Sequence, residues 1–344
     1  MDKYIVVTGG GTGGHLSVAK SFIEEFYKRG YKVIFIGSTK GQDKQWFENE
    51  SIIEHKYFMQ TRGVVNQSFF GKIFSLWLIF KALIKSVYII NKFNVKKVIS
   101  VGGFSAAPAS FASIFSSADL YIHEQNSVVG KLNKTTSKFA KEMFSSYLTN
   151  SKVKDYPINK KFFEKSRVRD SLNTIIFLGG SQGAKAINDF AVLLAPILNK
   201  MGINIIHQAG KNDYKRVKEE YDKLDITVDV FDFTDNLLKK MDKADFAVSR
   251  AGASTLWELV ALGIPTFFIP YPYAAANHQF YNAKYLVDNG YCYLQTEKEL
   301  EENFFLECIK NDLEPISKSL IGLIKKDSVK NIVDIIITDT TNLK

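Results

Sequence analysis

A pattern that occurs twice places the strongest limit on the fold: a short apolar strand leads into a glycine-rich turn, and a helix follows. It reads YIVVT-GGGTGG at residues 4–14 and TIIFL-GGSQGA at residues 174–184. Glycine lets the backbone approach a phosphate closely, and the amino end of a helix supplies N–H groups and about half a positive charge. We therefore predict two α/β domains with parallel sheets, each with a phosphate-ready first turn at the carboxyl ends of its strands.

The same alternation of strands and helices continues through all 344 residues, a length typical of about two domains. We expect strands at 4–8, 32–37, 97–102, 119–123, 174–178, 203–207, 227–231, 245–249, 266–270 and 291–294. Helices are expected at 16–29, 71–93, 105–116, 184–200, 214–224, 237–241, 254–262, 279–289 and 297–310. The predicted domains are 1–155, joined by the C-terminal segment 327–344, and 156–326.

The charge of the chain is distributed unevenly. Residues 55–118 contain no Asp or Glu but eight Lys or Arg residues, whereas the rest of the chain carries 37 bases and 36 acids. One face of the first domain should therefore be basic, and its partner should be a polyanion or an anionic membrane.

The cysteines and the amino terminus indicate the compartment. Cys292 and Cys308 are the only two cysteines and lack the CxxC spacing of a zinc site, which fits a reducing environment. The first residues, MDKYIVVTGGG, lack the basic and long apolar regions of a signal peptide. We therefore expect a cytosolic protein.

The first glycine turn alone leaves its ligand open. Gly9, Gly11 and Gly14 satisfy the GxGxxG pattern of dinucleotide-binding enzymes, but that pattern also requires an acid after the second strand, where this chain has IGSTK at 36–40. Two alternatives for this turn therefore remain. The protein is a dehydrogenase that binds a phosphate-bearing cofactor through Lys40, or the turn is purely structural and binds no ligand. His15 follows the turn at the start of a helix, where the dipole lowers the pKa of an imidazole. A neutral His15 can act as a general base, donate a hydrogen bond or cap the helix.

Several motifs together resemble one family. GGGTGGHLS, GGFSAAPA, HEQNSVVGKLNK, GGSQGAKAIN, HQAGK and SRAGASTLWELVALGIPTFFIPYPYAAANHQFYNA occur in the order found in the bacterial peptidoglycan N-acetylglucosaminyltransferases. The resemblance spans nearly the whole chain. It implies a GT-B fold, in which two Rossmann-like domains face each other across a cleft. It also implies transfer of N-acetylglucosamine (GlcNAc) from UDP-GlcNAc to the 4-hydroxyl of N-acetylmuramic acid (MurNAc) in lipid I, giving lipid II with inversion.

The resemblance also implies the residues of the site. His15 and Glu124 compete for the role of general base, while His123, next to Glu124 on a strand, is interpreted as structural. The residues expected to bind the donor UDP-GlcNAc are Thr12, Gly13, Gly14, His15, Asn126, Ser181, Gln182, Phe233, Thr234, Ala253, Ser254, Glu258 and Gln279. Among these, Glu258 should accept both ribose hydroxyls and Gln279 should recognise the sugar, with His278 and Asn282 as its neighbours. The acceptor diphosphate is expected at Gly13, Gly14, Gly102 and Gly103.

The expected direct displacement requires no cofactor and no metal. The chain has no Asp-x-Asp motif, and backbone N–H groups after the second glycine turn can stabilise the leaving diphosphate. Two positions depart from the family pattern. The arginine expected after the domain boundary is absent, with Lys160 as a candidate substitute, and Ala276 stands where relatives often have an acid.

The stretch 69–97 is the expected membrane contact. Phe74, Trp77, Lys81 and Lys85 are its expected contact residues, and the two lysines interrupt the ~20 apolar residues that a membrane span needs. Aromatic residues beside clustered lysines are typical of a helix that lies on anionic lipid. We expect a peripheral protein on the cytoplasmic face of the bacterial inner membrane. Its expected partners are UDP-GlcNAc, the undecaprenyl-linked MurNAc-pentapeptide, the anionic membrane surface and cell-wall synthesis proteins, with no nucleic acid. The alternatives are a related transferase with another acceptor and a non-catalytic UDP-sugar-binding regulator.

Overall fold

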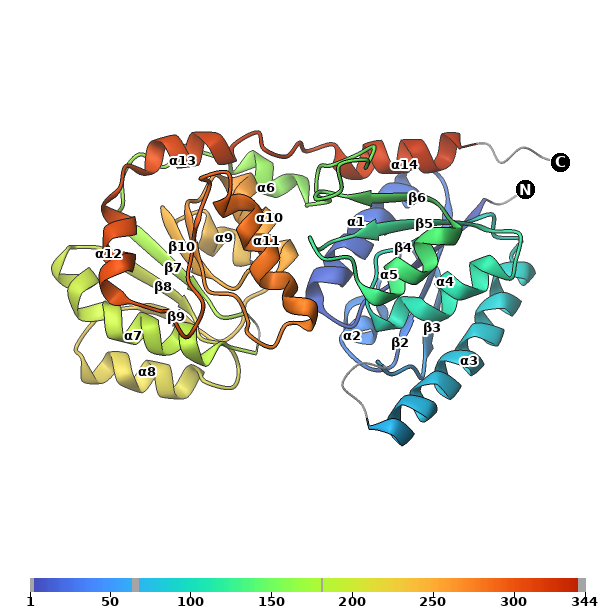
Figure 1. The fold of residues 1–344 in the computed structure, drawn as a ribbon, viewed down its shortest axis with the longest axis horizontal. Coiled ribbons are helices and arrows are strands. Elements are labelled where there is room, and N and C mark those ends of the chain that lie inside the picture. The colour runs from blue at the N-terminus through green and yellow to red at the C-terminus, as the bar shows by residue number, and fades with distance from the viewer. Residues whose placement is uncertain (1–2, 64–67, 181, 340–344) are drawn as a thin grey trace. The chain divides into compact units, whose positions relative to one another are not determined.

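The computed structural model describes residues 3–63, 68–180 and 182–339 and divides into two compact units. Unit 1 comprises residues 1–159 and 325–344, and unit 2 comprises residues 160–324 (Figure 1). These boundaries lie four residues and two residues from those proposed from the sequence, 155 and 327.

Unit 1 is built on a six-stranded sheet in which every neighbouring pair is parallel. Its strands are β1 (Tyr4–Thr8), β2 (Lys32–Ser38), β3 (Ile53–Met59), β4 (Lys97–Ser100), β5 (Asp119–Glu124) and β6 (Ala140–Ser145). The spatial order is β3-β2-β1-β4-β5-β6, so the direction of winding reverses between β1 and β4. Val6, Ile34 and Val98 lie on neighbouring strands and are fully buried, as expected for a parallel sheet covered on both faces.

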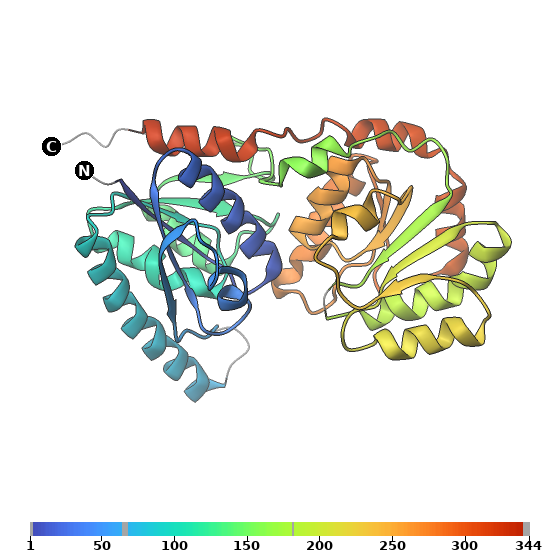
Figure 2. The same ribbon diagram turned by 180° about the vertical axis from the view of Figure 1, so that it is seen from behind.

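The helices of unit 1 connect these strands, and the last helix of the chain completes the unit. They are α1 (Gly13–Lys28), α2 (Asp43–Phe47), α3 (Phe69–Lys92), η1 (Phe104–Ala106), α4 (Ala107–Ile114), α5 (Lys131–Thr136), η2 (Ser137–Phe139) and α14 (Ser328–Thr338). Helix α14 packs on α1, with an ion pair of 2.7 Å between Arg29 and Asp334 (Figure 2). Lys97 Nζ donates to the carbonyl oxygens of Ile336 and Asp339, which places a cation at the carboxyl end of α14.

Unit 2 repeats the topology of unit 1. Its strands are β7 (Thr174–Leu178), β8 (Asn204–Gln208), β9 (Asp229–Phe231), β10 (Phe246–Ser249), β11 (Thr266–Phe268) and β12 (Tyr293–Leu294), in the order β12-β11-β10-β7-β8-β9. Its helices are α6 (Lys160–Glu164), α7 (Lys185–Lys200), α8 (Tyr214–Lys223), α9 (Leu237–Met241), α10 (Ala253–Leu262), η3 (Ala275–Asn277), α11 (His278–Val287), α12 (Glu302–Lys310) and α13 (Leu313–Leu320). Here the winding reverses between β7 and β10, and such a switch point is where ligands of this fold bind.

The prediction of two parallel α/β domains is confirmed, and each predicted strand is present within a few residues of its predicted limits. Two strands of unit 1 were missed, β3 and β6, and these are the two edge strands of its sheet. Glu54 on β3 and Lys141 on β6 are exposed, so these strands lack the continuous apolar run that marks a buried strand. The prediction of helix 297–310 was wrong in its first turn, because α12 begins only at Glu302.

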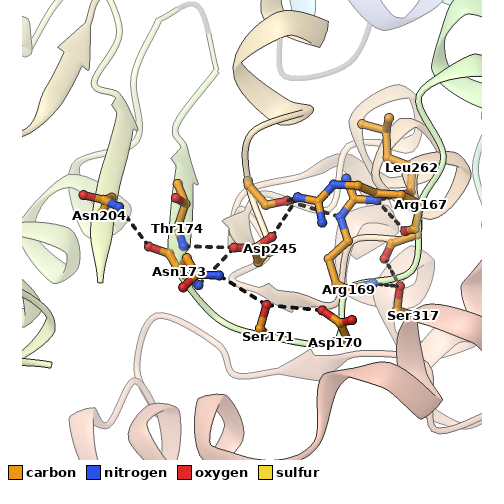
Figure 3. A network of polar contacts seen from close by, with 12 residues as sticks. Arg167, Arg169, Asp170, Ser171, Asn173, Thr174, Asn204, Asp245, Leu262 and Ser317 are labelled. Carbon is orange, nitrogen blue, oxygen red and sulfur yellow. Dashed lines mark hydrogen bonds and ion pairs between the residues drawn. The ribbon is translucent and has the colours of Figure 1, made fainter. Parts of the chain in front are cut away.

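A polar network fixes the end of unit 2 opposite the switch point (Figure 3). Asp245 Oδ2 accepts hydrogen bonds from the backbone N–H groups of Asn173 and Thr174 at 3.0 and 3.1 Å, which ties β10 to β7. The buried Arg169 side chain donates to the carbonyl oxygen of Leu262, the last residue of α10. Desolvation, with a smaller effect of Arg167, lowers the pKa of Arg169 to about 10, so its guanidinium stays charged at neutral pH.

Candidate functional site

The glycine turn after β1 is locked in place by a buried carboxylate. Asp43 Oδ1 accepts a hydrogen bond from Gly11 N at 2.6 Å, and Asp43 Oδ2 accepts one from Ser38 N at 2.8 Å. A Cβ atom on Gly10 would lie 2.6 Å from Asp43 Oδ1, so the turn requires glycine there. Desolvation raises the pKa of Asp43, and the backbone N–H groups act against that rise.

Asp43 was missed at the sequence level, and its position bears on the dinucleotide alternative. A dinucleotide-binding enzyme uses an acid near the end of the second strand to hold a ribose. Asp43 is the first residue of α2, soon after β2, but it is fully buried and both its oxygens are bonded to backbone within unit 1. The nearest acid therefore serves the turn and not a ribose.

The first turn of α1 brings His15 close to a second pair of glycines. His15 Nδ1 lies 2.9 Å from Thr12 Oγ1. A Cβ atom on Gly102 would lie 3.5 Å from His15 Nε2, and one on Gly103 would lie 2.1 Å from the carbonyl oxygen of Gly10. Both glycines have positive φ, 86° and 79°. The structure thus brings together the predicted residues of the first turn with Gly102 and Gly103 at the carboxyl ends of β1 and β4.

Glu124 ends β5, and its carboxylate binds the loop that follows. Oε1 accepts from Asn126 N at 2.9 Å, and Oε2 accepts from Gly130 N at 3.0 Å and from Asn133 Nδ2 at 2.8 Å. The side chain is buried. These three hydrogen bonds tie the carboxylate to the loop 126–133, so the geometry favours a structural role that positions Asn126.

His123 precedes Glu124 and points into the core of unit 1. Its ring lies 6.0 Å from that of Phe22 and 5.7 Å from that of Tyr156, measured between centroids. Desolvation, with a smaller effect of His15, lowers the pKa of His123 to about 3, so this imidazole is neutral at physiological pH.

In unit 2, a cavity of about 340 Å³ opens at the switch point. Its lining residues all follow strands or begin helices: Gly179, Gly183, Ala184, Lys185, Ala186, Arg250, Tyr271, Gln279 and Glu297. The glycine turn after β7 and the amino end of α7 therefore form one wall. Gln279 Oε1 accepts a hydrogen bond from Tyr271 N at 2.9 Å, which fixes the side chain that was predicted to read the sugar.

Arg250 and Glu297 also line this cavity and were missed at the sequence level. Arg250 Nη1 donates to the carbonyl oxygens of Ile269 and Pro270 at 3.0 and 3.1 Å, and Nη2 donates to Glu297 Oε1. The guanidinium carbon lies 5.6 Å from the centre of the Tyr271 ring. The sequence did contain a signal for Arg250: it is a basic residue in the SRAGAS motif, directly after the carboxyl end of a predicted strand, where ligands of this fold bind.

Glu258 lies on the second turn of α10, one turn after Ser254. Ser254 Oγ donates to Glu258 Oε1 at 2.9 Å, and desolvation raises the pKa of Glu258 against the opposing effect of that hydrogen bond. Ala253, the first residue of α10, is buried. These residues follow β10 and therefore lie toward the same edge of the sheet as the cavity, although they are not among its lining residues.

The remaining predicted donor residues lie around the same edge. Phe233 and Thr234 follow β9, with Phe233 exposed and Lys211 Nζ 5.3 Å from the centre of its ring. Gln182 is exposed in the glycine turn, while Ser181 lies outside the described residues. His278 Nδ1 lies 2.9 Å from the carbonyl oxygen of Ala275, and Asn282 Nδ2 donates to Ala251 O at 3.2 Å.

The two positions that depart from the family pattern are also described. Lys160 is exposed at the start of α6. Ala276 has a positive φ of 51°, in the turn that precedes α11. Within residues 3–63, 68–180 and 182–339, no group of three or more His, Cys, Asp or Glu side chains is arranged to hold a metal ion.

Comparison with known proteins identifies relatives over the full length. The glycosyltransferase family 28 N-terminal domain matches residues 5–145, and the family 28 C-terminal domain matches residues 174–333. The UDP-N-acetylglucosamine–N-acetylmuramyl-(pentapeptide) pyrophosphoryl-undecaprenol N-acetylglucosamine transferase of Sulfurovum sp. is 48% identical, covering 96% of this chain and 98% of the relative. The enzyme of the same name from Wolinella succinogenes is 46% identical, covering 97% of this chain and 99% of the relative.

Solved structures share the fold. The crystal structure of Acinetobacter baumannii MurG superposes with a TM-score of 0.78 at 24% identity, covering 97% of this chain and 99% of that chain. The UDP-GlcNAc 2-epimerase of Neisseria meningitidis bound to UDP-GlcNAc superposes with a TM-score of 0.62 at 15% identity, covering 98% of this chain and all of that one.

Proposed function

Because the chain belongs to the family of UDP-N-acetylglucosamine–N-acetylmuramyl-(pentapeptide) pyrophosphoryl-undecaprenol N-acetylglucosamine transferases, which have the GT-B fold, we infer that it catalyses that transfer. The substrates are UDP-GlcNAc and lipid I, and the product is lipid II, an intermediate of peptidoglycan synthesis. The observation that carries this conclusion is identity of 48% along 96% of the chain.

Unit 2 is proposed to bind the donor. The cavity at the switch point suits the diphosphate, because the amino end of α7 and the backbone N–H groups of the glycine turn converge there. Glu258 is proposed to accept the ribose hydroxyls, and Phe233 and Thr234 to lie beside the uracil. The side-chain oxygen of Gln279 already accepts a hydrogen bond from Tyr271 N, so its amide N–H groups are proposed to donate to the sugar. Asn126, Ala253, Ser254, Gln182 and Ser181 are proposed as further donor contacts.

His15 is proposed as the general base. Inverting transfer by direct displacement needs one group to take the proton of the acceptor hydroxyl, and no covalent nucleophile on the protein. His15 lies at the glycine turn with its Nε2 directed toward Gly102, where the acceptor diphosphate is proposed to bind through Gly13, Gly14, Gly102 and Gly103. The competing residue, Glu124, already accepts three hydrogen bonds, which disfavours it as the base.

The leaving diphosphate is proposed to be stabilised by backbone dipoles without a metal. Donors fixed in place before the reaction stabilise developing negative charge without reorganisation. The amino end of α7 supplies such donors, and Lys185 in its first turn adds a positive charge at the wall of the cavity. This chemistry assigns no step to a cofactor.

Helix α3 is proposed as the membrane contact of unit 1. By length and composition alone it could cross a membrane, although Lys81 and Lys85 interrupt its apolar run. One face of α3, including Leu78, Ala82, Ile89 and Ile90, is buried against the core of the unit. That packing makes α3 part of the folded domain and leaves its other face for a surface contact.

The exposed face of α3 has the composition of an interfacial helix. The large apolar side chains exposed on it are Phe69, Phe70, Ile73, Phe74, Leu76, Trp77, Phe80, Ile84 and Tyr88. Lys81 Nζ lies 3.9 Å from the centre of the Trp77 ring, and Lys85 is exposed one turn later. Aromatic rings of this kind can bury in the headgroup region, and the neighbouring ammonium groups can contact lipid phosphates. This composition suits a peripheral position on the cytoplasmic leaflet of the inner membrane. The lipid tail of the acceptor requires such a surface.

A thermal shift screen separates this function from the alternatives. UDP and UDP-GlcNAc should raise the Tm of the full chain, because a ligand that binds only the folded state stabilises it. NAD and NADP should leave the Tm unchanged, and a shift with either instead would favour the dehydrogenase. Turnover of a lipid I analogue then separates an enzyme from a UDP-sugar-binding regulator.

A further inference from the structure

A buried polar cluster lies directly behind the glycine turn that borders the cavity of unit 2. The Asn188 cluster consists of Asn188 on α7, His207 on β8, and Asp213, Arg216 and Tyr221 at or on α8. Asn188 and His207 are fully buried. None of these side chains lines the cavity, and the proposed function gives none of them a role.

Asn188 is the centre of this cluster. Its Nδ2 donates to the carbonyl oxygen of Ala209 at 3.0 Å and to Asp213 Oδ2 at 2.7 Å. Its Oδ1 lies 3.1 Å from His207 Nε2, and His207 Nδ1 lies 2.8 Å from the hydroxyl of Tyr221. An amide oxygen can only accept, so His207 carries its proton on Nε2 and accepts from Tyr221 through Nδ1. Burial lowers the pKa of His207 to about 3, so this arrangement is neutral and fixed at physiological pH.

The backbone that Asn188 bonds is the floor of the glycine turn. A Cβ atom on Gly183 would lie 2.5 Å from the carbonyl oxygen of Ala209, and one on Gly210 would lie 2.0 Å from Gly183 N. Gly179 N donates to Gln208 O at 3.2 Å on the other side of the turn. Gly179 and Gly183 of the first turn are therefore in direct backbone contact with residues 208–210, and a shift of 208–210 would displace them.

The outer part of the cluster, on the solvent side of Asn188, is made by Arg216 and two carboxylates. Arg216 Nε donates to Asp213 Oδ1 at 2.7 Å, and Arg216 Nη2 lies 2.8 Å from Asp189 Oδ1. The guanidinium lowers the pKa of Asp213, so the carboxylate that accepts from Asn188 stays ionised. Residues 188 and 189 are neighbours on α7, so the cluster ties the first part of α7 to the start of α8 at two points.

We propose that Asn188 is a positioning residue for the donor diphosphate, acting through the carbonyl oxygen of Ala209 to hold Gly179 and Gly183 of the second glycine turn in their phosphate-binding geometry. The inference rests on the proposed function, because the diphosphate is assigned to that turn there. The uridine part of the donor is assigned to other residues, Glu258, Phe233 and Thr234, so loss of Asn188 should affect phosphate binding selectively.

The test compares the affinity of the full chain for UDP and for uridine by calorimetry. Asn188→Ala should raise the Kd of UDP about tenfold, or ~1.4 kcal/mol, while the Kd of uridine changes less than twofold. Asn199→Ala, at the exposed far end of α7, is the matched control and should change neither. Equal weakening of UDP and uridine, or an unchanged Kd for UDP, would overturn the proposal.

A second measurement needs no variant, in case Asn188→Ala fails to fold. The amides of Asp213 and Tyr214 donate to Gly210 O at 3.3 and 3.1 Å, and their hydrogen exchange reports on the second turn. Saturating UDP should slow this exchange more than saturating uridine does, and equal exchange with both ligands contradicts the proposal. A wild-type chain that binds no UDP contradicts the proposed function itself, whereas normal UDP binding without these differences contradicts only the role of Asn188.

Discussion

Ser254 Oγ donates a hydrogen bond of 2.9 Å to Glu258 Oε1, one turn further along α10. The bond orients a carboxylate that burial would otherwise favour in its protonated form, since desolvation raises the pKa of Glu258 and Ser254 acts against that rise. The pair thus keeps one oxygen fixed and the group available as a hydrogen-bond acceptor for a diol.

Removing the Glu258 carboxylate should weaken the binding of the donor UDP-GlcNAc. In the proposed site, Glu258→Ala would leave the ribose hydroxyls without partners, which costs ~1–3 kcal/mol. We expect the KM for UDP-GlcNAc to rise by about tenfold to a hundredfold on that range, with an unchanged far-UV circular dichroism spectrum as the control for folding. Unchanged kinetic constants for the donor would remove Glu258 from the site.

The raised pKa of Glu258 also predicts the pH dependence of donor binding. Only the carboxylate accepts two hydroxyl donors, so the Kd of UDP-GlcNAc should rise as the pH falls through the raised pKa, starting above the ordinary value of 4.5. Glu258→Gln should bind more weakly at pH 7 but lack this rise. For the free protein the sign is opposite: a raised carboxyl pKa contributes stability at low pH that is lost as the pH increases through it.

His15 should matter for the chemical step. Removal of a positioned base typically slows a reaction by ~10²–10⁴-fold, so His15→Ala should lower kcat by that factor with nearly normal UDP affinity. Glu124→Gln replaces an acceptor of three hydrogen bonds by a group with one donating end, so it should lower the Tm of the chain. If Glu124→Gln lost kcat at an unchanged Tm while His15→Ala stayed active, the base would be Glu124.

Gln279 should determine which sugar is accepted. Its oxygen is held by Tyr271 N, so its amide N–H groups are oriented toward the sugar hydroxyls in the proposed site. Gln279→Ala should reduce the preference for UDP-GlcNAc over its 4-epimer, measured as the ratio of the two kcat/KM values. Phe280→Ala, at the next position of α11, is the control for a general disturbance of the helix. The same preference in Gln279→Ala and wild type would contradict the assignment.

Membrane docking should depend on the lysines of α3. Lys81 and Lys85 are each expected to contribute up to ~1 kcal/mol at an anionic surface, so Lys81→Glu/Lys85→Glu should sediment much less with vesicles that contain anionic lipid. The matched control is Lys134→Glu/Lys138→Glu, which makes the same charge change on exposed residues of α5 and η2. Equal sedimentation of wild type and the α3 variant, or binding that does not respond to salt, would exclude this surface.

The fold could be predicted from the sequence because the patterns that indicate it involve residues close together in the chain. A strand, a glycine turn and a helix are adjacent in the chain, and parallel order follows from their alternation. Edge strands such as β3 were missed because their polar side chains face solvent. Asp43 and Asn188 could not be assigned from the sequence, since their partners lie up to 32 residues away and only folding brings them together. The family resemblance implied Glu124 as a candidate base, but its three hydrogen-bond donors are visible only in the structure.

The most direct test of the central claim is the structure of the product formed from UDP-GlcNAc and a lipid I analogue. Proton NMR of the isolated product reports both the linkage position and the anomeric configuration. The account predicts one new GlcNAc residue, joined in the β configuration to the 4-hydroxyl of MurNAc, formed at an unchanged rate in the presence of EDTA. No transfer, an α linkage or strict dependence on an added metal ion would contradict it.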